Sequence, residues 1–201
     1  MFSDKCVFDT SQRGSVWVTR LPTERYHDHC MQHNFHSGHA YFMVWGAISY
    51  NWKSPLVFLD GTGPKGVIVK DYLHQVLEPI VAPAFMDLLE YDASPEAQYI
   101  EDQAPIHGTG RMLRETKNIL GIPLHKRPPS SPDFNPIENV WRILKQRIKA
   151  RDTFPQNIHD LIKAVQEEWD HLQPSAWNQY IDNMPVRLAQ VKERKGMQTE
   201  F

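Results

Sequence analysis

The pattern of apolar and polar positions predicts strands in the first part of the chain and mainly helices after it. Apolar stretches over 1–8, 15–20, 40–49 and 55–60 have the length and residue types of β-strands. The stretch at 40–49 is almost continuously apolar, which is typical of a central strand buried on both faces. The spacing of these stretches favours antiparallel pairing before the first helix.

Helical spacing of apolar residues begins near residue 67. It predicts a helix over 67–89, and two prolines are expected to kink or split this helix. A strand is predicted over 97–102, followed by a helix over 109–120 that ends at Gly121 and by a last strand over 122–126. Two further helices are expected toward the end of the chain, over 158–172 and over 177–191, the second kinked by a proline.

A proline-dense segment over 128–136 leads directly into an amphipathic helix. Its prolines fix φ and bias the residues before them toward extended conformations, so the segment itself cannot be helical. Asn135 is the expected N-cap, and Glu138 falls in the first turn, where the helix dipole favours an acid. From the pattern alone, Glu138 could be an ordinary capping acid. The buried stripe of this helix is expected to contain Ile137, Val140, Trp141, Leu144 and Ile148.

The length and composition indicate one compact domain. A chain of 201 residues, 41% of them hydrophobic, can bury a substantial core. Its two cysteines, Cys6 and Cys30, are too few for a disulfide framework, which favours a reducing compartment. No apolar stretch approaches the length of a membrane span, and no targeting signal is evident. We therefore expect a nuclear protein in a eukaryote and a cytoplasmic protein otherwise.

Charge is distributed unevenly, although the formal net charge is only −2. Residues 71–102 contain eight acids and neither Lys nor Arg, whereas residues 111–151 contain ten basic residues and three acids. Such a basic block can bind a nucleic-acid backbone, although a solvated charged surface is the simpler explanation. The candidates for contact with DNA are Lys126, Arg127, Arg142, Lys145 and Lys149.

Two weaker motifs suggest other kinds of site. The segment over 27–39 contains five histidines and a cysteine that could ligate zinc, but no second group of ligands occurs elsewhere, as a structural zinc site usually requires. The segment over 61–66 matches the pattern G-x-G-x-x-G, but Pro64 removes an amide that would bind phosphate. The preceding strands also do not alternate with helices, so an ordinary glycine turn is the better interpretation.

Three acids occupy positions where a functional side chain is commonly found. Asp4 lies in the first predicted strand, Asp102 at the end of a later strand and Glu138 at a helix start. If the two strands are neighbours and the helix crosses their edge, the three carboxylates converge. Hard oxygen ligands of this kind suit Mg²⁺ or Mn²⁺. Two such ions could activate a water or a 3′-hydroxyl and neutralise the leaving oxygen of a phosphodiester.

Four sequence blocks resemble the motifs of the catalytic domain of Tc/mariner-type DDE transposases. They are FSD at 2–4, VWG at 44–46, YIEDQAPIH at 99–107 and SPDFNPIENVW at 131–141. The resemblance implies that Asp4, Asp102 and Glu138 are the catalytic metal ligands, and the 35 residues between the last two are close to the family's usual spacing. It also implies an α/β fold of the RNase H-like, retroviral-integrase-like type, a mixed sheet flanked by helices. The implied activity is metal-dependent DNA cleavage with strand transfer.

The chain differs from the family pattern at Lys5, where an acid is usual, and at Gln103, where Asn is usual. Family members carry N-terminal helix-turn-helix modules, whereas this chain starts three residues before Asp4, so recognition of transposon ends is expected to be absent.

We place the catalytic domain at 1–151, with C-terminal helices over 152–201 packed on it. DNA is the expected partner, with a homodimer as the assembly to consider. The alternative is a catalytically inactive, domesticated nucleic-acid-binding protein that retains the fold.

Overall fold

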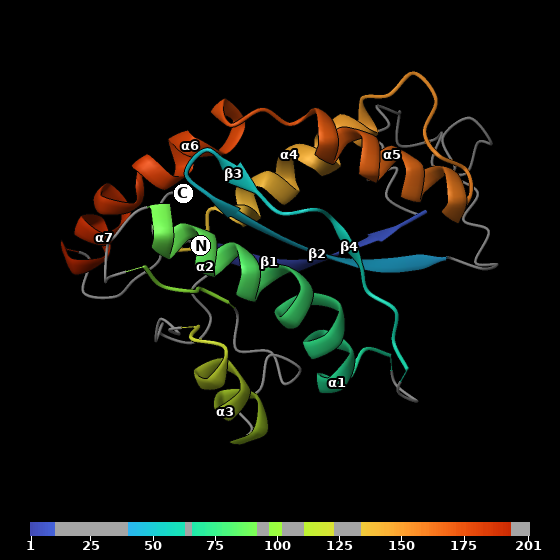
Figure 1. Ribbon diagram of the computed structural model, residues 1–201. Coiled ribbons are helices and arrows are strands. Elements are labelled where there is room, and N and C mark those ends of the chain that lie inside the picture. The colour runs from blue at the N-terminus through green and yellow to red at the C-terminus, as the bar shows by residue number, and fades with distance from the viewer. Residues whose placement is uncertain (11–39, 63–65, 92–96, 102–110, 123–133, 194–201) are drawn as a thin grey trace.

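A mixed β-sheet built on two long antiparallel strands lies between two layers of helices (Figure 1). The computed structural model describes residues 1–10, 40–62, 66–91, 97–101, 111–122 and 134–193. Strand β1 (Phe2–Asp9) pairs along its whole length with β2 (Tyr41–Ser49). The other edge of β2 pairs with two short strands, β3 (Trp52–Lys53) and β4 (Val57–Phe58). On the free side of β1, Phe2 forms a parallel bridge with Ile100.

The strands predicted over 1–8 and 40–49 are confirmed as β1 and β2. The stretch over 55–60 contributes only the two residues of β4. The pairing of β2 with β3 ends just before it, at Ser54. There the Oγ of Ser54, instead of a backbone oxygen, accepts the N–H of Ala47 at 2.9 Å. The strands predicted over 15–20 and, apart from its first residue, over 122–126 lie outside the described residues.

A long helical segment over 69–91 and helix α3 cover one face of the sheet (Figure 1). The segment consists of α1 (Val69–Tyr72), the π-helix η3 (Leu73–Val81) and α2 (Ala82–Tyr91). The expected split at the prolines does not occur, because Pro79 falls inside the π-helix, whose altered hydrogen-bond pattern accommodates a residue without an N–H. Helix α3 (Arg111–Ile119) ends as predicted at Gly121, whose φ of +67° is the left-handed conformation that favours glycine.

Three helices cover the opposite face: α4 (Ile137–Lys149), α5 (Ile158–His171) and α6 (Ser175–Asp182), with α7 (Met184–Glu193) following. The predicted apolar stripe of α4 is confirmed, since all five of its residues are buried. The single helix predicted over 177–191 is two helices. Pro185 lies in the first turn of α7, where its missing N–H costs no helical hydrogen bond. No helix in the described part of the chain is long and apolar enough to cross a membrane.

Each face of the sheet buries its own apolar cluster. Phe2, Cys6 and Phe8 of β1 belong to the cluster under α4, α5 and α6, whereas Trp45 and Ala47 of β2 belong to the cluster under the 69–91 segment and α3. Successive side chains in a strand point to opposite faces. The alternation therefore assigns every even-numbered residue of β1 from 2 to 8 to the face that α4 covers.

Helix α4 approaches the sheet most closely at Gly46 of β2. Two indole rings, those of Trp141 and Trp169, stack over this glycine with their centroids 5.4 Å apart. A methyl group at position 46 would lie 2.8 Å from Cη2 of Trp141 and 2.9 Å from Cη2 of Trp169. Gly46 is thus required for the close approach of α4 and α5 to the sheet.

We expect the substitution Gly46→Ala to lower the free energy of unfolding by about 1–3 kcal/mol, the usual cost of an overpacked core. Chemical denaturation followed by tryptophan fluorescence would measure this change. The exposed substitution Ser175→Ala at the start of α6 serves as a control for handling. A Gly46→Ala protein as stable as the wild type would show that the indole rings can move away without cost.

Lys53 of β3 fastens the end of α5 to the sheet. Its Nζ donates hydrogen bonds to the backbone oxygens of Trp169, Asp170 and Leu172, at 3.0 Å for Asp170 and 2.9 Å for Leu172. The same ammonium group lies 5.8 Å from the centre of the Trp169 ring. A cation at this place satisfies carbonyl groups that the helix leaves without partners and complements the negative end of its dipole.

Asp71 organises the turn before the 69–91 helical segment. Its carboxylate accepts hydrogen bonds from the Ile68 N–H, the Thr62 N–H and the Thr62 hydroxyl, at 2.9, 2.9 and 2.6 Å. These donors, led by the Ile68 amide, hold the pKa of Asp71 below its ordinary value of 3.8. Charged Asp71 therefore stabilises the folded protein.

Because the pKa of Asp71 is lower in the folded than in the unfolded protein, its contribution is fully present above pH 3.8 and is lost as the pH falls through the folded pKa. We expect Asp71→Asn to lower the melting temperature at neutral pH and to reduce the further loss of stability on acidification. Thermal unfolding of both proteins between pH 7 and pH 3 would measure the difference. Parallel stability curves for the two proteins would contradict this role.

Candidate catalytic site

Asp4 lies in the middle of β1, on the face of the sheet that α4 covers. It is 6% exposed and sits opposite Gly46 of β2, so no side chain on the neighbouring strand crowds it. The buried thiol of Cys6 follows two residues later on the same face. The strand thus presents a carboxylate next to the seam between β1 and α4.

Asn135 fixes the start of α4 to β1. Its Nδ2 donates a hydrogen bond of 3.1 Å to the backbone oxygen of Ser3, the residue before Asp4. The prediction that Asn135 is the N-cap is wrong, because the N-cap is Pro136 and the buried Oδ1 of Asn135 accepts no hydrogen bond in the described residues. Its backbone oxygen accepts the N–H of Glu138 at 3.0 Å. Asn135 therefore connects the strand that carries Asp4 to the first turn of the helix that carries Glu138.

The pKa of the buried Cys6 thiol responds to the charges near the start of α4. Glu138 is exposed in the first turn of α4. Burial raises the pKa of the Cys6 thiol to about 11; the cation of Lys145 opposes this rise, and the charges of Asp4 and Glu138 add to it. Asp4 lies on the face of the sheet that α4 covers, and Glu138 belongs to the first turn of α4. Two of the three predicted site residues thus belong to elements that pack on each other, and their shared role as metal ligands stays a prediction.

Asp102, the third predicted ligand, lies outside the described residues, so the convergence of all three acids stays a prediction. Among the described residues, no group of three His, Cys, Asp or Glu side chains could hold a metal ion. The chain reaches the sheet directly before Asp102: the Ser3 N–H donates to the Ile100 oxygen at 2.8 Å, and the Ile100 N–H donates to the Met1 oxygen at 2.9 Å. Carboxylate oxygens such as those of Asp4 and Glu138 fit Mg²⁺ or Mn²⁺.

The predicted DNA-contacting residues of α4 lie on the same face of that helix as Glu138. Arg142 and Lys149 are exposed, and Arg142 donates a hydrogen bond of 3.0 Å to Oδ1 of Asn139. Lys145 is half-buried, with its Nζ 5.6 Å from the centre of the Phe8 ring. The side chain of Lys145 thus lies over β1, whereas Arg142 and Lys149 are exposed to solvent. The other two candidates, Lys126 and Arg127, lie outside the described residues.

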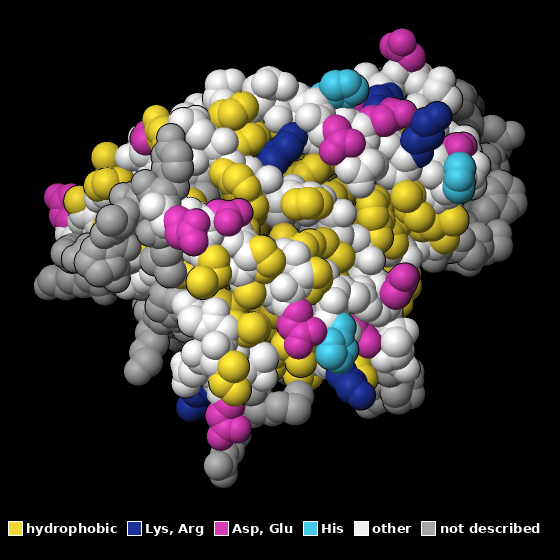
Figure 2. Space-filling model, in the orientation of Figure 1, with side chains coloured by type: hydrophobic (Ala, Val, Ile, Leu, Met, Phe, Trp, Pro, Cys, Tyr) yellow, Lys and Arg dark blue, Asp and Glu magenta, His cyan; other side chains and the backbone are white. Residues whose placement is uncertain are grey.

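The acidic part of the sequence lies on the other side of the molecule. Exposed Glu78, Asp87 and Glu90 lie on the 69–91 segment, and acidic side chains are scattered among apolar ones on the face that this segment forms (Figure 2). A polyanion would be repelled there. The separation of charge between the two sides is partial, because Arg114 of α3, in the basic part of the sequence, is exposed on the side that the 69–91 segment covers.

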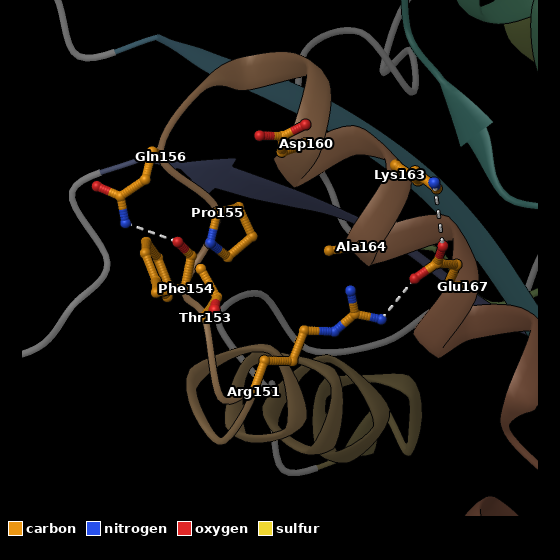
Figure 3. Close-up of a pocket in the computed structure, with 9 residues that line it drawn as sticks. All are labelled: Arg151, Thr153, Phe154, Pro155, Gln156, Asp160, Lys163, Ala164 and Glu167. Atoms are coloured by element: carbon orange, nitrogen blue, oxygen red, sulfur yellow. Dashed lines mark hydrogen bonds and ion pairs between the residues drawn. The ribbon is translucent and has the colours of Figure 1, made fainter.

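A hollow of about 280 Å³ between the end of α4 and α5 is a separate feature (Figure 3). None of the predicted site residues lines it. Its principal cation, Arg151, is bound to Glu167 at 2.7 Å and to Glu168 at 3.0 Å. The hydrogen bond to Glu167 is the main reason why the pKa of Arg151 is raised. In this hollow, the ion pairs of Arg151 thus connect the end of α4 to α5.

The two weaker motifs have different outcomes. The candidate zinc segment over 27–39 lies outside the described residues. At the glycine motif, Gly61 allows a close backbone contact, because a Cβ there would lie 2.3 Å from the carbonyl carbon of Gly66. The amides of Thr62 and Ile68 already donate to Asp71. The described part of this loop thus bonds to a protein carboxylate, as an ordinary turn does.

Two residues of the site region were missed by sequence reasoning. Cys6 could have been found, because it is two positions from Asp4 in a strand and must share its face. Asn135 was given the wrong partner, because Asn before Pro at a helix start is typical of an N-cap. No local signal indicates that its side chain reaches a strand more than a hundred residues earlier in the chain.

Comparisons with known proteins show the family and the fold of this chain. The DDE superfamily endonuclease family matches residues 29–162. The Tcb2 transposase of Caenorhabditis briggsae is 25% identical over 206 residues, covering 100% of this chain and 70% of that protein. The Mos1 transposase catalytic domain, solved with raltegravir and Mn, superposes with a TM-score of 0.62 at 17% identity over 80% of this chain and 78% of that chain. A Mos1 paired-end complex with the left transposon end gives a TM-score of 0.66 at 14% identity, over 98% and 56%.

The family match covers more than half of the chain and includes both Gly46 and Glu138. The structural matches show that the sheet and its two helical layers form an RNase H-like fold, as predicted. The chain therefore belongs to the DDE superfamily endonucleases and is a relative of the Tc/mariner transposases.

Proposed function

We propose that this chain carries out metal-dependent phosphodiester hydrolysis and strand transfer in DNA transposition, with Asp4, Asp102 and Glu138 as its catalytic carboxylates. The observation that carries the proposal is the hydrogen bond from Asn135 to the Ser3 backbone, which sets the start of α4 beside Asp4. Glu138 is exposed there and so accessible to a large substrate, whereas Asp4 is held in a rigid strand.

The place of Asp102 in the proposal rests on strand register. Phe2 and Ile100 form a parallel bridge. Asp4 and Asp102 each lie two residues further along the same two segments. A parallel ladder continued in this register would set the two carboxylates side by side on one face of the sheet.

Mg²⁺ or Mn²⁺ is the proposed cofactor, held by these three carboxylates. The Mos1 catalytic domain was solved with Mn, which supports the use of such an ion by this fold. A bound ion would supply Lewis-acid stabilisation of the charge that develops on the phosphate oxygens. The protein's own part is to keep the carboxylates at a fixed separation, through the β1 ladder and the Asn135 contact.

DNA is the proposed substrate, bound along the outer face of α4. Arg142 and Lys149 are exposed cations on the helix face that begins with Glu138, so a phosphate backbone bound to them would pass the carboxylates. We include Lys126 and Arg127 in this surface because they precede the same helix. Lys145 is half-buried, so we assign it chiefly to the balance of charge around Asp4 and Glu138.

The decisive experiment measures nicking of supercoiled duplex DNA in Mg²⁺ or Mn²⁺ by the wild type, Asp4→Asn, Asp102→Asn and Glu138→Gln. Loss of a metal ligand removes several kcal/mol of transition-state stabilisation, so each variant should be slower by more than about 100-fold. Asp152→Asn, an exposed acid just beyond α4, is the matched control and should retain full activity.

Equal nicking by the wild type and the three variants would reveal a contaminating nuclease and remove support for the proposed site. DNA binding without any cleavage by the wild type would support the alternative of an inactive nucleic-acid-binding protein. Circular dichroism spectra of all variants would separate loss of a ligand from loss of fold.

Lys5, the cation that follows Asp4, lies on the other face of the sheet. Its partner across the ladder is Trp45, which belongs to the apolar cluster under the 69–91 segment. Lys5 therefore follows Asp4 in sequence but lies on the opposite face of the sheet from it. We expect Lys5→Gln to nick DNA at the wild-type rate with an unchanged dependence on Mn²⁺ concentration. A substantial gain or loss of apparent metal affinity would show that its charge acts through the sheet.

A further inference from the structure

A buried chain of polar side chains lies behind the candidate site, on the face of the sheet that the 69–91 segment and α3 cover. The hydroxyl of Ser3 donates to the hydroxyl of Tyr99 at 2.8 Å, which is hydrogen-bonded to the hydroxyl of Tyr72 at 2.8 Å. Tyr72 in turn donates to Glu101 at 3.0 Å, and Lys117 of α3 donates to the other oxygen of Glu101. This series of hydrogen bonds thus connects α3 to the start of β1.

This arrangement is deeply buried. The side chains of Lys117 and Glu101 are 1% and 8% exposed, and Tyr72 and Tyr99 are fully buried. Lys117 also lies 5.9 Å from the centre of the Tyr72 ring. An ion pair in such surroundings contributes little net stability compared with apolar residues, because both charges must leave water. A role in fixing geometry explains the network better than a role in stability.

The members of the network adjoin two of the proposed catalytic acids. Ser3 directly precedes Asp4, and Glu101 directly precedes Asp102. Because neighbouring side chains of a strand point to opposite faces, contacts that hold Ser3 on one face orient Asp4 on the other. The same two segments are bridged by the Ser3 and Ile100 amides.

We propose that Tyr99 and Lys117 are positioning residues, which set the relative place of the two strand segments that carry Asp4 and Asp102 and thereby tune metal affinity from the far side of the sheet. This inference rests on the proposed function for its effect on metal binding. Its structural part, that the network holds the two segments together, can be tested without a metal ion.

The first measurement is hydrogen exchange at the Ser3 and Ile100 amides, followed by NMR in the metal-free protein. Tyr99→Phe keeps the ring but removes the hydroxyl that joins Ser3 to Tyr72, and Lys117→Met removes the partner of Glu101. We expect both amides to exchange at least about tenfold faster in each variant, as expected for local opening. Tyr99→Phe keeps the test valid if Lys117→Met does not fold.

Lys53→Met is the matched control. It removes another lysine that donates several hydrogen bonds, but this half-buried lysine binds the end of α5 on the opposite side of the sheet. Exchange should become faster near Trp169 and Leu172 in this variant, with no change at Ser3 and Ile100. If the amides of Ser3 and Ile100 exchange equally faster in the control and in the network variants, a general loss of stability explains the effect. That result would overturn the proposal.

The second measurement is Mn²⁺ binding by calorimetry. We expect the dissociation constant to rise by about 10-fold in Tyr99→Phe and Lys117→Met, the size of effect that groups behind metal ligands usually have, and to stay unchanged in Lys53→Met. Unchanged Mn²⁺ affinity in both network variants would overturn the positioning role. If the wild type itself binds no Mn²⁺, the proposed function fails, and the exchange data separately decide whether the network holds the two segments.

Discussion

The site depends on the close contact between α4 and the sheet at β1 and β2. Gly46 provides the space in which Trp141 and Trp169 stack, and Asn135 completes the contact by donating to the Ser3 backbone. Without this approach, Glu138 would belong to a surface helix unrelated to Asp4. Gly46 and the Asn135 side chain thus set the helix of Glu138 against the strand of Asp4, although the two acids are 134 positions apart in sequence.

The sheet separates two kinds of task between its faces. The face under α4 carries Asp4 and Cys6, and α4 itself carries Glu138 and Lys145. The opposite face carries the ion pair of Lys117 and Glu101 and the two tyrosines. Strand alternation makes this division possible, because the side chains of adjacent residues in a strand point to opposite faces of the sheet. It also explains why Lys5 need not disturb the acid that precedes it.

Local rules failed where a residue had a stronger tertiary partner or an unusual backbone. Asn135 was expected to cap its own helix but contacts β1 instead. Pro79 was expected to kink or split a helix; the segment is not split and passes through Pro79 as a π-helix packed on the sheet. The strand expected over 55–60 is reduced to the two residues of β4. For Asn135 the competing interaction involves a strand that no local window of sequence contains.

The sequence by itself determined the order of the main elements, the buried stripe of α4 and the identity of the family, because apolar periodicity and the 131–141 block are local properties of the chain. It also named the three candidate acids. Only the tertiary structure decided that the helix carrying Glu138 packs on the face of the sheet where Asp4 lies, that Nζ of Lys145 lies over the Phe8 ring while Arg142 stays exposed, and that a buried polar network backs the strand of Asp4. These facts follow from the packing of segments distant in sequence, where the direction of a side chain depends on register and on the neighbours that cover it.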